Sequence, residues 1–199
     1  MKILSQSVKL ESVTENPERL IEKHGRICWG SHDKMTENSA HEFISKLIRL
    51  GHHSVIEHAS ASFKIVSDRA ICMEIVRHRI ASFSMSSTRY IRYTDDVPFI
   101  EPPDLNKEQR IEWMESCIFS EKQYKKLLSI GCSPQIARSV LPNCTAAELA
   151  MTANFRAWLH FIELRGSKAA HPQIRPIAHE INRILAEHAP SIFKVEVCE

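Results

Sequence analysis

The residues best suited to chemistry in this sequence lie between Arg77 and Tyr90. This stretch holds three arginines, one histidine and five serine or threonine hydroxyls, and no acidic residue falls among them. Guanidinium groups offer planar forks of N–H donors that match phosphate oxygens, and hydroxyls and free backbone amides fill the remaining acceptor sites. The stretch, called the anion segment below, is therefore predicted to bind an anion. The alternative is a solvated basic surface without a ligand.

The order of residues in the anion segment resembles a known signature. Arg77, His78 and Arg79 are followed after seven residues by Ser87, and this arrangement is similar to the signature of the flavin-dependent thymidylate synthases. Further matches to that family follow in the family's order between about residues 50 and 175: Gly51-His52-His53-Ser54, Glu57-His58, Ala137-Arg138-Ser139-Val140-Leu141-Pro142, Thr152-Ala153-Asn154, Leu164-Arg165 and Ala170-His171-Pro172-Gln173.

The resemblance implies a fold, a reaction and a set of cofactors. It implies an α+β fold with a central antiparallel sheet flanked by helices, assembled as a homotetramer whose active sites are shared between subunits. It also implies reductive methylation of dUMP to dTMP, with 5,10-methylenetetrahydrofolate as carbon donor and NADPH as the reductant of bound FAD. In such a reaction the cofactors carry the redox chemistry, and the protein binds them, orients them and supplies charge.

The resemblance further assigns roles to individual residues. Arg165 takes the main catalytic role, because the family's arginine at this place contacts the pyrimidine ring and helps to ionise its N3. The residues implied in flavin binding are His52, Ser54, Arg77, His78, Arg79, Asn154, Arg156 and His160, with Glu57 and His58 in support. The residues implied in nucleotide binding are Glu74, Arg77, Ser86, Ser87, Thr88, Arg89, Arg138 and Arg165.

Some of these residues also have a purely structural interpretation. Arg138 lies among mostly small or apolar residues of a predicted helix, where a long cationic side chain commonly extends to water. Arg165 lies at a predicted helix end, where a cation complements the helix dipole. The histidines between residues 52 and 58 lack the His-Glu-x-x-His spacing of zinc proteases, so no metal site is predicted.

One departure from the family pattern leaves other functions open. Many family members carry a polar or acidic pair between Ser84 and Ser87, whereas this chain has Met85 and Ser86. A thioether is only a weak hydrogen-bond acceptor. One alternative is therefore a flavin- and folate-dependent C5 hydroxymethylase or methylase of dUMP or dCMP. A more distant alternative is a non-catalytic nucleotide- or RNA-binding module, although the interleaved aromatics that stack on bases are absent.

Composition limits the class of protein. The chain has 199 residues, 43% of them hydrophobic, which suits a single domain over residues 1–199. A net charge of +2 is too small for a protein that binds nucleic-acid polymers. The six cysteines contain no C-x-x-C pair, a pattern that fits a reducing compartment. No stretch approaches the ~20 apolar residues of a membrane span, so we expect a soluble cytoplasmic protein.

Hydrophobic periodicity predicts the elements that must position these residues. A helix is predicted from Ser39, with a capping box to Glu42, and it ends at Gly51. Alternating residues predict a strand from Ala59 to Val66. Cys28 and Trp29 are predicted to pack inward. Further helices are predicted over residues 107–130 and 154–164 and after Pro172; the resemblance implies a strand over residues 146–152, where composition alone also allows a helix.

The anion segment is predicted to begin at the C-terminus of a helix capped by Asp68. A helix C-terminus stabilises cations, so Arg77, His78 and Arg79 are predicted to be charged before any ligand binds. The second half of the segment, residues 83–91, is predicted to be extended.

Overall fold

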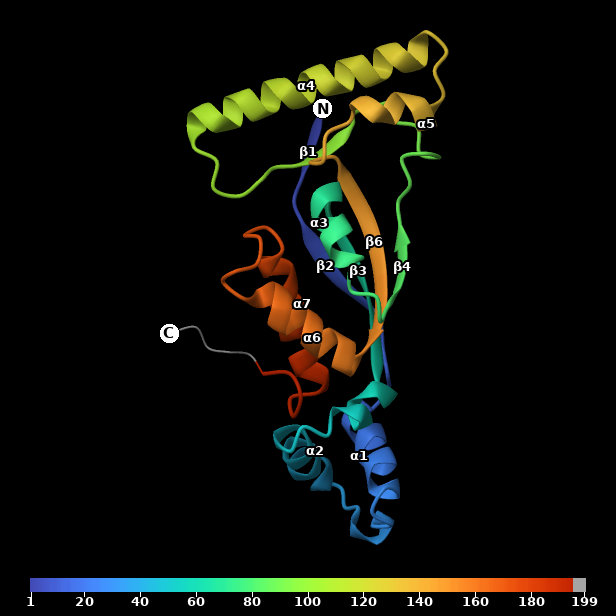
Figure 1. Cartoon of the computed structure of the whole chain (residues 1–199), viewed down its shortest axis with the longest axis vertical. Helices are drawn as coiled ribbons and strands as arrows, with labels where there is room; N and C mark the ends of the chain where they lie inside the picture. The colour runs from blue at the N-terminus through green and yellow to red at the C-terminus, as the bar shows by residue number, and fades with distance from the viewer. Residues whose placement is uncertain (195–199) are drawn as a thin grey trace. The chain divides into compact units, whose positions relative to one another are not determined.

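The structure is a computed structural model that describes residues 1–194, so Cys198 lies outside the described residues. The fold is α+β with an antiparallel sheet and helices, as predicted (Figure 1). The chain divides into two compact units. Unit 1 comprises Met1–Ser7, Ile65–Arg77 and Phe83–Leu149, and unit 2 comprises Val8–Lys64, His78–Ser82 and the described residues from Ala150 onward. The expectation of a single domain over residues 1–199 stays a prediction.

The main sheet has four strands in the order β2-β3-β6-β4. Their bounds are Ser7–Val13 for β2, Ser60–Asp68 for β3, Ala146–Asn154 for β6 and Ser82–Met85 for β4. At one end of the β2–β3 pair the Thr14 amide donates to the Ser60 carbonyl at 2.9 Å. At the other end the Ser67 hydroxyl donates to Gln6 Oε1 at 2.8 Å, so the two strands are antiparallel.

Alternation of side chains along the strands explains why they pair as a half-buried sheet. On β3 the buried side chains include Ala61, Phe63 and Ile65, as predicted, and on β6 they include Leu149, Met151 and Ala153. The hydroxyls of Ser62 and Thr152 lie 2.7 Å apart on the exposed face. The strand that the resemblance implied over residues 146–152 is confirmed.

Unit 1 contains the longest helix. Its helical elements are α3 (Arg69–Ile75), α4 (Lys107–Ser129), α5 (Pro134–Ala137) and the 3-10 turn η3 (Arg138–Val140). A capping box between Asn106 and Gln109 starts α4, and Gly131, with φ of +97°, ends it. Strand β1 (Lys2–Leu4) pairs in parallel with β5 (Pro98–Ile100). The buried side chains at the centre of this unit are Val97, Phe99, Cys117, Tyr124 and Ala137.

Unit 2 is built on two helix pairs. Its elements are α1 (Pro17–Ile27), η1 (His32–Lys34), α2 (Ser39–Arg49), η2 (His53–His58), α6 (Phe155–Gly166) and α7 (Arg175–His188). Helix α1 packs on α2, and α6 packs on α7. Gly25 permits the close packing of α1 on α2, because a Cβ there would lie 2.8 Å from the Phe43 ring. Trp158 anchors α6, since its indole nitrogen donates to the Ala61 carbonyl at 3.0 Å.

Three local predictions are wrong. The Ser39 hydroxyl donates to Glu22 Oε1 at 2.6 Å and makes no capping box with Glu42. Cys28 and Trp29 do not pack inward: Cys28 is exposed and Trp29 is 52% exposed, because α1 continues through Ile27 and leaves the next turn at the surface. Residues 87–91 form a turn instead of an extended strand. No helix within residues 1–194 is both long and apolar enough to cross a bilayer.

Candidate active site

The residues predicted to form the site fall into two groups, one in each unit. Unit 1 holds Glu74, Arg77, Ser86, Ser87, Thr88, Arg89 and Arg138. Unit 2 holds His52, Ser54, His78, Arg79, Asn154, Arg156, His160 and Arg165. The division falls between the nucleotide group and the flavin group, with two exceptions. Arg77, which the resemblance assigned to both ligands, lies in unit 1, and Arg165 lies in unit 2.

Arg165 and His78 meet although they are 87 residues apart in the sequence. Arg165 lies in the last turn of α6, and its Nε donates to His78 Nε2 at 3.0 Å. The edge of the His78 imidazole packs against the Phe161 ring, with centroids 4.9 Å apart, and the His160 ring lies 5.9 Å away. Helix α6 therefore supplies the arginine, the packing surface and a second imidazole around one residue of the anion segment.

His78 is neutral, contrary to the prediction that it is charged. Burial lowers its pKa from 6.5 to about 4, and the positive charges of Arg165 and His160 add to this effect. These effects outweigh the helix C-terminus from which the prediction was made. Because Nε2 accepts the hydrogen bond from Arg165, the proton of the neutral ring lies on Nδ1. The guanidinium of Arg165 is thus oriented by an uncharged partner.

The start of α6 carries Asn154 and Arg156. The Asn154 carboxamide oxygen caps the helix by accepting from the Ala157 amide at 2.9 Å, which leaves its NH2 group as the donor to offer a ligand. Arg156 Nη1 donates to Glu57 Oε1 at 2.6 Å, and both side chains are exposed to solvent. Glu57 was expected to have a supporting role, and here it restrains Arg156. The exposed ion pair contributes little to stability, so Arg156 can exchange it for an anionic ligand.

His52 immediately precedes η2, Ser54 lies within it, and both side chains are exposed. The His52 ring stacks on the indole of Trp29, with centroids 6.0 Å apart and planes 22° apart. Trp29 was placed in the core by its hydrophobicity alone, and that reasoning missed its position beside a predicted flavin contact. The signal in the sequence that could have indicated this surface position was an aromatic residue directly after the end of a helix.

In unit 1 the anion segment turns back after β4. The Ser87 carbonyl accepts from the amides of Tyr90 and Ile91 at 3.0 and 2.9 Å, and the Ser87 hydroxyl accepts from the Arg89 amide at 3.3 Å. This side-chain-to-backbone bond favours a turn over the predicted extended chain. The Ser87 hydroxyl keeps its proton as a donor for a ligand.

Two arginines of unit 1 are held near the turn by neutral partners. Arg138 Nη1 lies 3.5 Å from the hydroxyl of Thr88, whose side chain is buried. Arg89 Nε donates to Gln135 Oε1 at 3.2 Å, and its guanidinium lies 5.3 Å from the Tyr90 ring centre. Within residues 1–194 neither guanidinium forms an ion pair with a carboxylate. Both arginines are therefore suited to an anionic group.

Ser86 continues the pairing of β4 with β6. Its amide donates to the Glu148 carbonyl at 2.8 Å, and its hydroxyl oxygen accepts from the Glu148 amide at 3.1 Å. The hydroxyl proton remains the group it can offer to a nucleotide. Gln135, the partner of Arg89, was missed by sequence reasoning, because it lies 46 residues away and no local pattern marks it.

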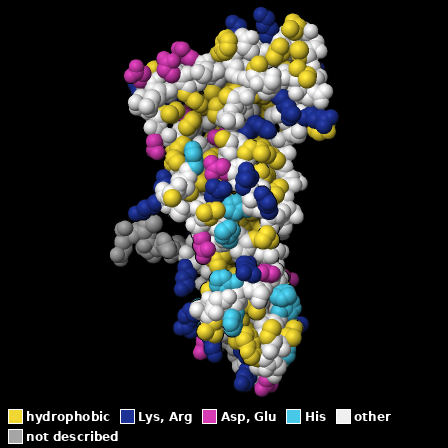
Figure 2. Space-filling view, viewed as in Figure 1, with side chains coloured by type: hydrophobic (Ala, Val, Ile, Leu, Met, Phe, Trp, Pro, Cys, Tyr) yellow, Lys and Arg dark blue, Asp and Glu magenta, His cyan; other side chains and the backbone are white. Residues whose placement is uncertain are grey.

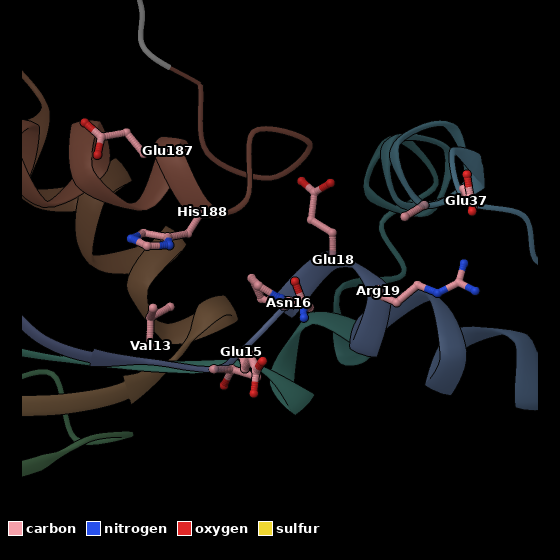
Figure 3. A pocket seen from close by; sticks show the side chains of 11 residues that line it. Val13, Glu15, Asn16, Glu18, Arg19, Glu37, Glu187 and His188 are labelled. Atoms are coloured by element: carbon pink, nitrogen blue, oxygen red, sulfur yellow. The ribbon is translucent and has the colours of Figure 1, made fainter.

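A pocket of about 610 Å³ lies elsewhere in unit 2 (Figure 3). Its lining includes Glu15, Glu18, Glu37 and Glu187, with Arg19 and His188. None of the predicted site residues lines it, and its acidic lining disfavours a phosphate. Within residues 1–194 no group of three or more His, Cys, Asp or Glu side chains is placed to hold a metal ion.

Comparisons with known proteins match almost the whole chain. A family profile, Thy1, described as thymidylate synthase complementing protein, matches residues 9–191. A flavin-dependent thymidylate synthase of Geobacter sulfurreducens is 35% identical over 191 residues, which cover 91% of this chain and 82% of the relative. A second such relative, from Mycobacterium avium, is 36% identical over 194 residues, covering 87% of this chain and 77% of the relative.

The fold is also similar to a solved structure. A UMP/dUMP methylase, PolB from Streptomyces cacaoi, was solved with 5-Br dUMP bound. It matches this chain with a TM-score of 0.85 and 25% sequence identity. The match covers 98% of this chain and 96% of PolB.

Proposed function

Because the chain belongs to the family of flavin-dependent thymidylate synthases, which are enzymes, we propose that it methylates dUMP at C5 to give dTMP. The proposed carbon donor is 5,10-methylenetetrahydrofolate, and the proposed reductant is NADPH. The observation that carries the proposal is the contact of Arg165 with His78, because it joins two of the family's motifs, Arg77-His78-Arg79 and Leu164-Arg165, at one guanidinium. A non-catalytic nucleotide- or RNA-binding module does not agree with membership of an enzyme family.

Arg165 is proposed to act on the pyrimidine. A guanidinium beside the ring stabilises negative charge at N3, and this charge makes C5 a better nucleophile toward the folate's one-carbon unit. Because His78 is neutral and accepts from Nε, this hydrogen bond orients the guanidinium of Arg165 without neutralising its positive charge. His78 thereby gains a second proposed role beside flavin binding.

The nucleotide phosphate is proposed to bind Arg138 and Arg89, with hydroxyls from Ser86, Ser87 and Thr88. The two guanidiniums already lie beside the turn of the anion segment, held by the neutral partners Thr88 and Gln135. Neutral partners fix the side chains without competing with the phosphate for charge. Glu74 and Arg77, which flank the end of α3, are proposed to complete the nucleotide site.

The donors of unit 2 fit a flavin dinucleotide. Arg79 and Arg156 are exposed cations, Asn154 offers its NH2 group at the start of α6, and His160 is exposed one turn later. These groups suit the pyrophosphate, and the exposed indole beside His52 suits an aromatic ring. Bound FAD, once reduced by NADPH, would supply the hydride that completes the methyl group.

The site is proposed to be shared between subunits of a homotetramer in the cytoplasm. FAD, folate and nucleotide together need a larger concave surface than one chain of this size commonly offers.

Met85, the last residue of β4, motivates an alternative reaction. Its half-buried thioether stands where many family members carry an amide or acid that can bind ligand. A C5 hydroxymethylase, or an enzyme that acts on dCMP, is the corresponding alternative.

The proposal is tested by anaerobic assays in which each component is left out in turn. Complete mixtures of dUMP, FAD, NADPH and methylenetetrahydrofolate are expected to give product, and mixtures without FAD or without folate are expected to give none. Product formed in the absence of folate would overturn the proposed carbon donor, and turnover without any flavin would overturn the family mechanism. Replacing NADPH by dithionite separates the choice of reductant from the rest.

A further inference from the structure

Two cysteine side chains of unit 1 lie in contact although they are 27 residues apart in the sequence. Cys117 lies on α4 and Cys144 lies two residues before β6, and their Sγ atoms are 3.6 Å apart. Cys117 is buried, with 1% of its surface exposed, whereas Cys144 is partly exposed. Of the cysteines within residues 1–194, only these two are joined to each other by a hydrogen bond.

The contact makes the two thiols unequal. The Cys117 thiol donates to Cys144 Sγ, and this hydrogen bond raises the pKa of Cys117, which burial raises further. The same hydrogen bond is the largest cause of the lowered pKa of Cys144; it outweighs burial, and the Trp113 indole adds to it. A thiolate, and not a thiol, is the nucleophilic form of cysteine. Cys144 is therefore both the more reactive and the more accessible sulfur of the pair.

We propose that Cys117 and Cys144 are a reversible oxidation site, at which a hydroperoxide converts the two thiols into a disulfide that joins α4 to the start of β6. An S–S bond is about 2.05 Å long, so the sulfur atoms must approach each other by about 1.5 Å. The Cys144 carbonyl is held by the Ile100 amide at 2.9 Å. We therefore expect side-chain rotation, and not a backbone shift at Cys144, to supply most of this movement.

The oxidation proceeds in two steps, written here for hydrogen peroxide. The Cys144 thiolate attacks one peroxide oxygen, the O–O bond breaks, and the leaving hydroxide takes up the proton that Cys144 lost, which gives water and a sulfenic acid. The Cys117 sulfur then attacks the Cys144 sulfur, the S–O bond breaks, and the hydroxide leaves with the Cys117 proton as water. Two thiols are oxidised and one peroxide is reduced to two waters. A dithiol reverses the bridge by exchange and itself becomes a disulfide.

The surroundings of the pair suit a small uncharged oxidant. Both cysteines pack in the hydrophobic core of unit 1, with Phe99 and Tyr124. Charged and hydrophobic side chains are mixed over α4 in Figure 2, so this face does not favour a charged oxidant. In a reducing compartment a disulfide of this kind is transient, which is typical of redox-sensing pairs and not of structural bridges.

The oxidation site does not depend on the proposed reaction, because neither cysteine is assigned to FAD or to the nucleotide. The bridge would close residues 117–144 into a covalent loop, and this loop contains Arg138. Its test measures the mass of peptides and not turnover, so failure of one proposal leaves the other intact.

The experiment treats the folded full chain with hydrogen peroxide, alkylates the remaining thiols and maps peptides by mass spectrometry. The peptides of Cys117 and Cys144 are expected to be joined, with the loss of two hydrogen atoms, and to separate after dithiothreitol. Thiols held in contact have an effective concentration of at least about 1 mM, so at about 10 µM protein this bridge is expected to exceed disulfides between chains about a hundredfold.

Serine variants separate the roles of the two sulfurs. Cys117→Ser keeps a hydrogen-bond donor for Cys144 but removes the second thiol, so Cys144 is expected to accumulate as a sulfenic acid that dimedone traps. Cys144→Ser leaves the buried Cys117, which is expected to take up about tenfold less dimedone. The matched control is Cys28→Ser, which removes an exposed cysteine and is expected to form the bridge as the wild type does.

Three results would each overturn the proposal: no joined peptide from the folded wild type, equal dimedone labelling of Cys117 and Cys144 in the two variants, or a bridge that forms only in urea. Circular dichroism before and after oxidation shows whether each chain reacts in its folded state. The wild-type peptide map decides by itself where a serine variant does not fold.

Discussion

Removal of the Arg165 guanidinium is expected to change the protonation of His78 in a direction that the structure sets. In the wild type, burial is the largest cause of the lowered pKa of His78, followed by the charges of Arg165 and His160. Arg165→Met removes the second cause and leaves the first. The pKa of His78 is therefore expected to rise from about 4 and to remain below 6.5. Arg165→Lys keeps the charge without the planar fork and is the matched control, with a smaller rise.

The size of the effect makes it measurable. At about pH 6 a pKa near 4 leaves about 1% of His78 protonated, whereas a pKa near 6.5 leaves about three quarters protonated. The Arg165→Met variant is expected to lie between these limits. In the wild type the neutral ring is expected to carry its proton on Nδ1, because Nε2 accepts from Arg165 at 3.0 Å.

The assay is a pH titration of 15N-labelled histidine by NMR, in which the His78→Gln variant identifies the resonances of His78 among those of 11 histidines. Nitrogen shifts report both the pKa and the tautomer. A wild-type His78 that titrates near 6.5, or a neutral ring protonated on Nε2, would refute the reasoning. A pKa that is the same in Arg165→Met would show that the contact does not influence the imidazole.

Four further predictions concern turnover, cofactor binding, assembly and stability. Arg165→Ala is expected to abolish most turnover of dUMP while circular dichroism and much of the FAD binding are retained; near-normal turnover would refute its catalytic role. Arg77→Ala and Arg79→Ala each remove charge-assisted hydrogen bonds worth about 1.5 to 3 kcal/mol, so FAD affinity is expected to fall about tenfold to a hundredfold in titrations; unchanged affinity would exclude both from the flavin site. Inactive Arg138→Ala and Arg77→Ala subunits, unfolded and refolded together, are expected to recover some activity if one site takes these residues from different chains; no recovery in verified mixed oligomers would count against shared sites. Because the folded pKa of His78 lies below its unfolded value, the unfolded chain binds more protons between about pH 6.5 and 4, and the free energy of unfolding should fall as pH drops through that window. His78→Gln should lose less over the same window in denaturant titrations, and an equal loss would contradict a buried neutral imidazole.

The elements with strong local signals were predictable. The alternation of Ala61, Phe63 and Ile65 fixed both the existence and the buried face of β3. Asp68 caps α3 as expected, since its Oδ1 accepts from the Ile71 amide at 2.8 Å. In each case one short stretch of sequence contains the whole cause of the structure.

Features that depend on distant residues were not predictable from local pattern. Strand β5 has only three residues and exists because β1, about a hundred residues earlier, pairs with it. Ser39 looked like half of a capping box, yet Glu22 of α1 takes its hydroxyl. A propensity acts locally, and tertiary contacts override it.

The same distinction applies to the candidate site. The residue types in the anion segment predicted that it binds an anion. The family resemblance indicated which residues elsewhere in the chain belong to the same site. The charge of His78 was misjudged, because the helix end was visible in the sequence while burial and the approach of α6 were not. Protonation is set by the assembled environment of a side chain, which a linear pattern does not contain.

We propose that this chain transfers a one-carbon unit to C5 of dUMP and that the unit is reduced to a methyl group. The most direct test is the mass of the nucleotide formed anaerobically from dUMP with methylenetetrahydrofolate, NADPH and FAD. We expect a nucleotide heavier than dUMP by one CH2 unit, and no corresponding product from dCMP. A product that carries an additional oxygen, or a modified dCMP with dUMP left unchanged, would contradict it.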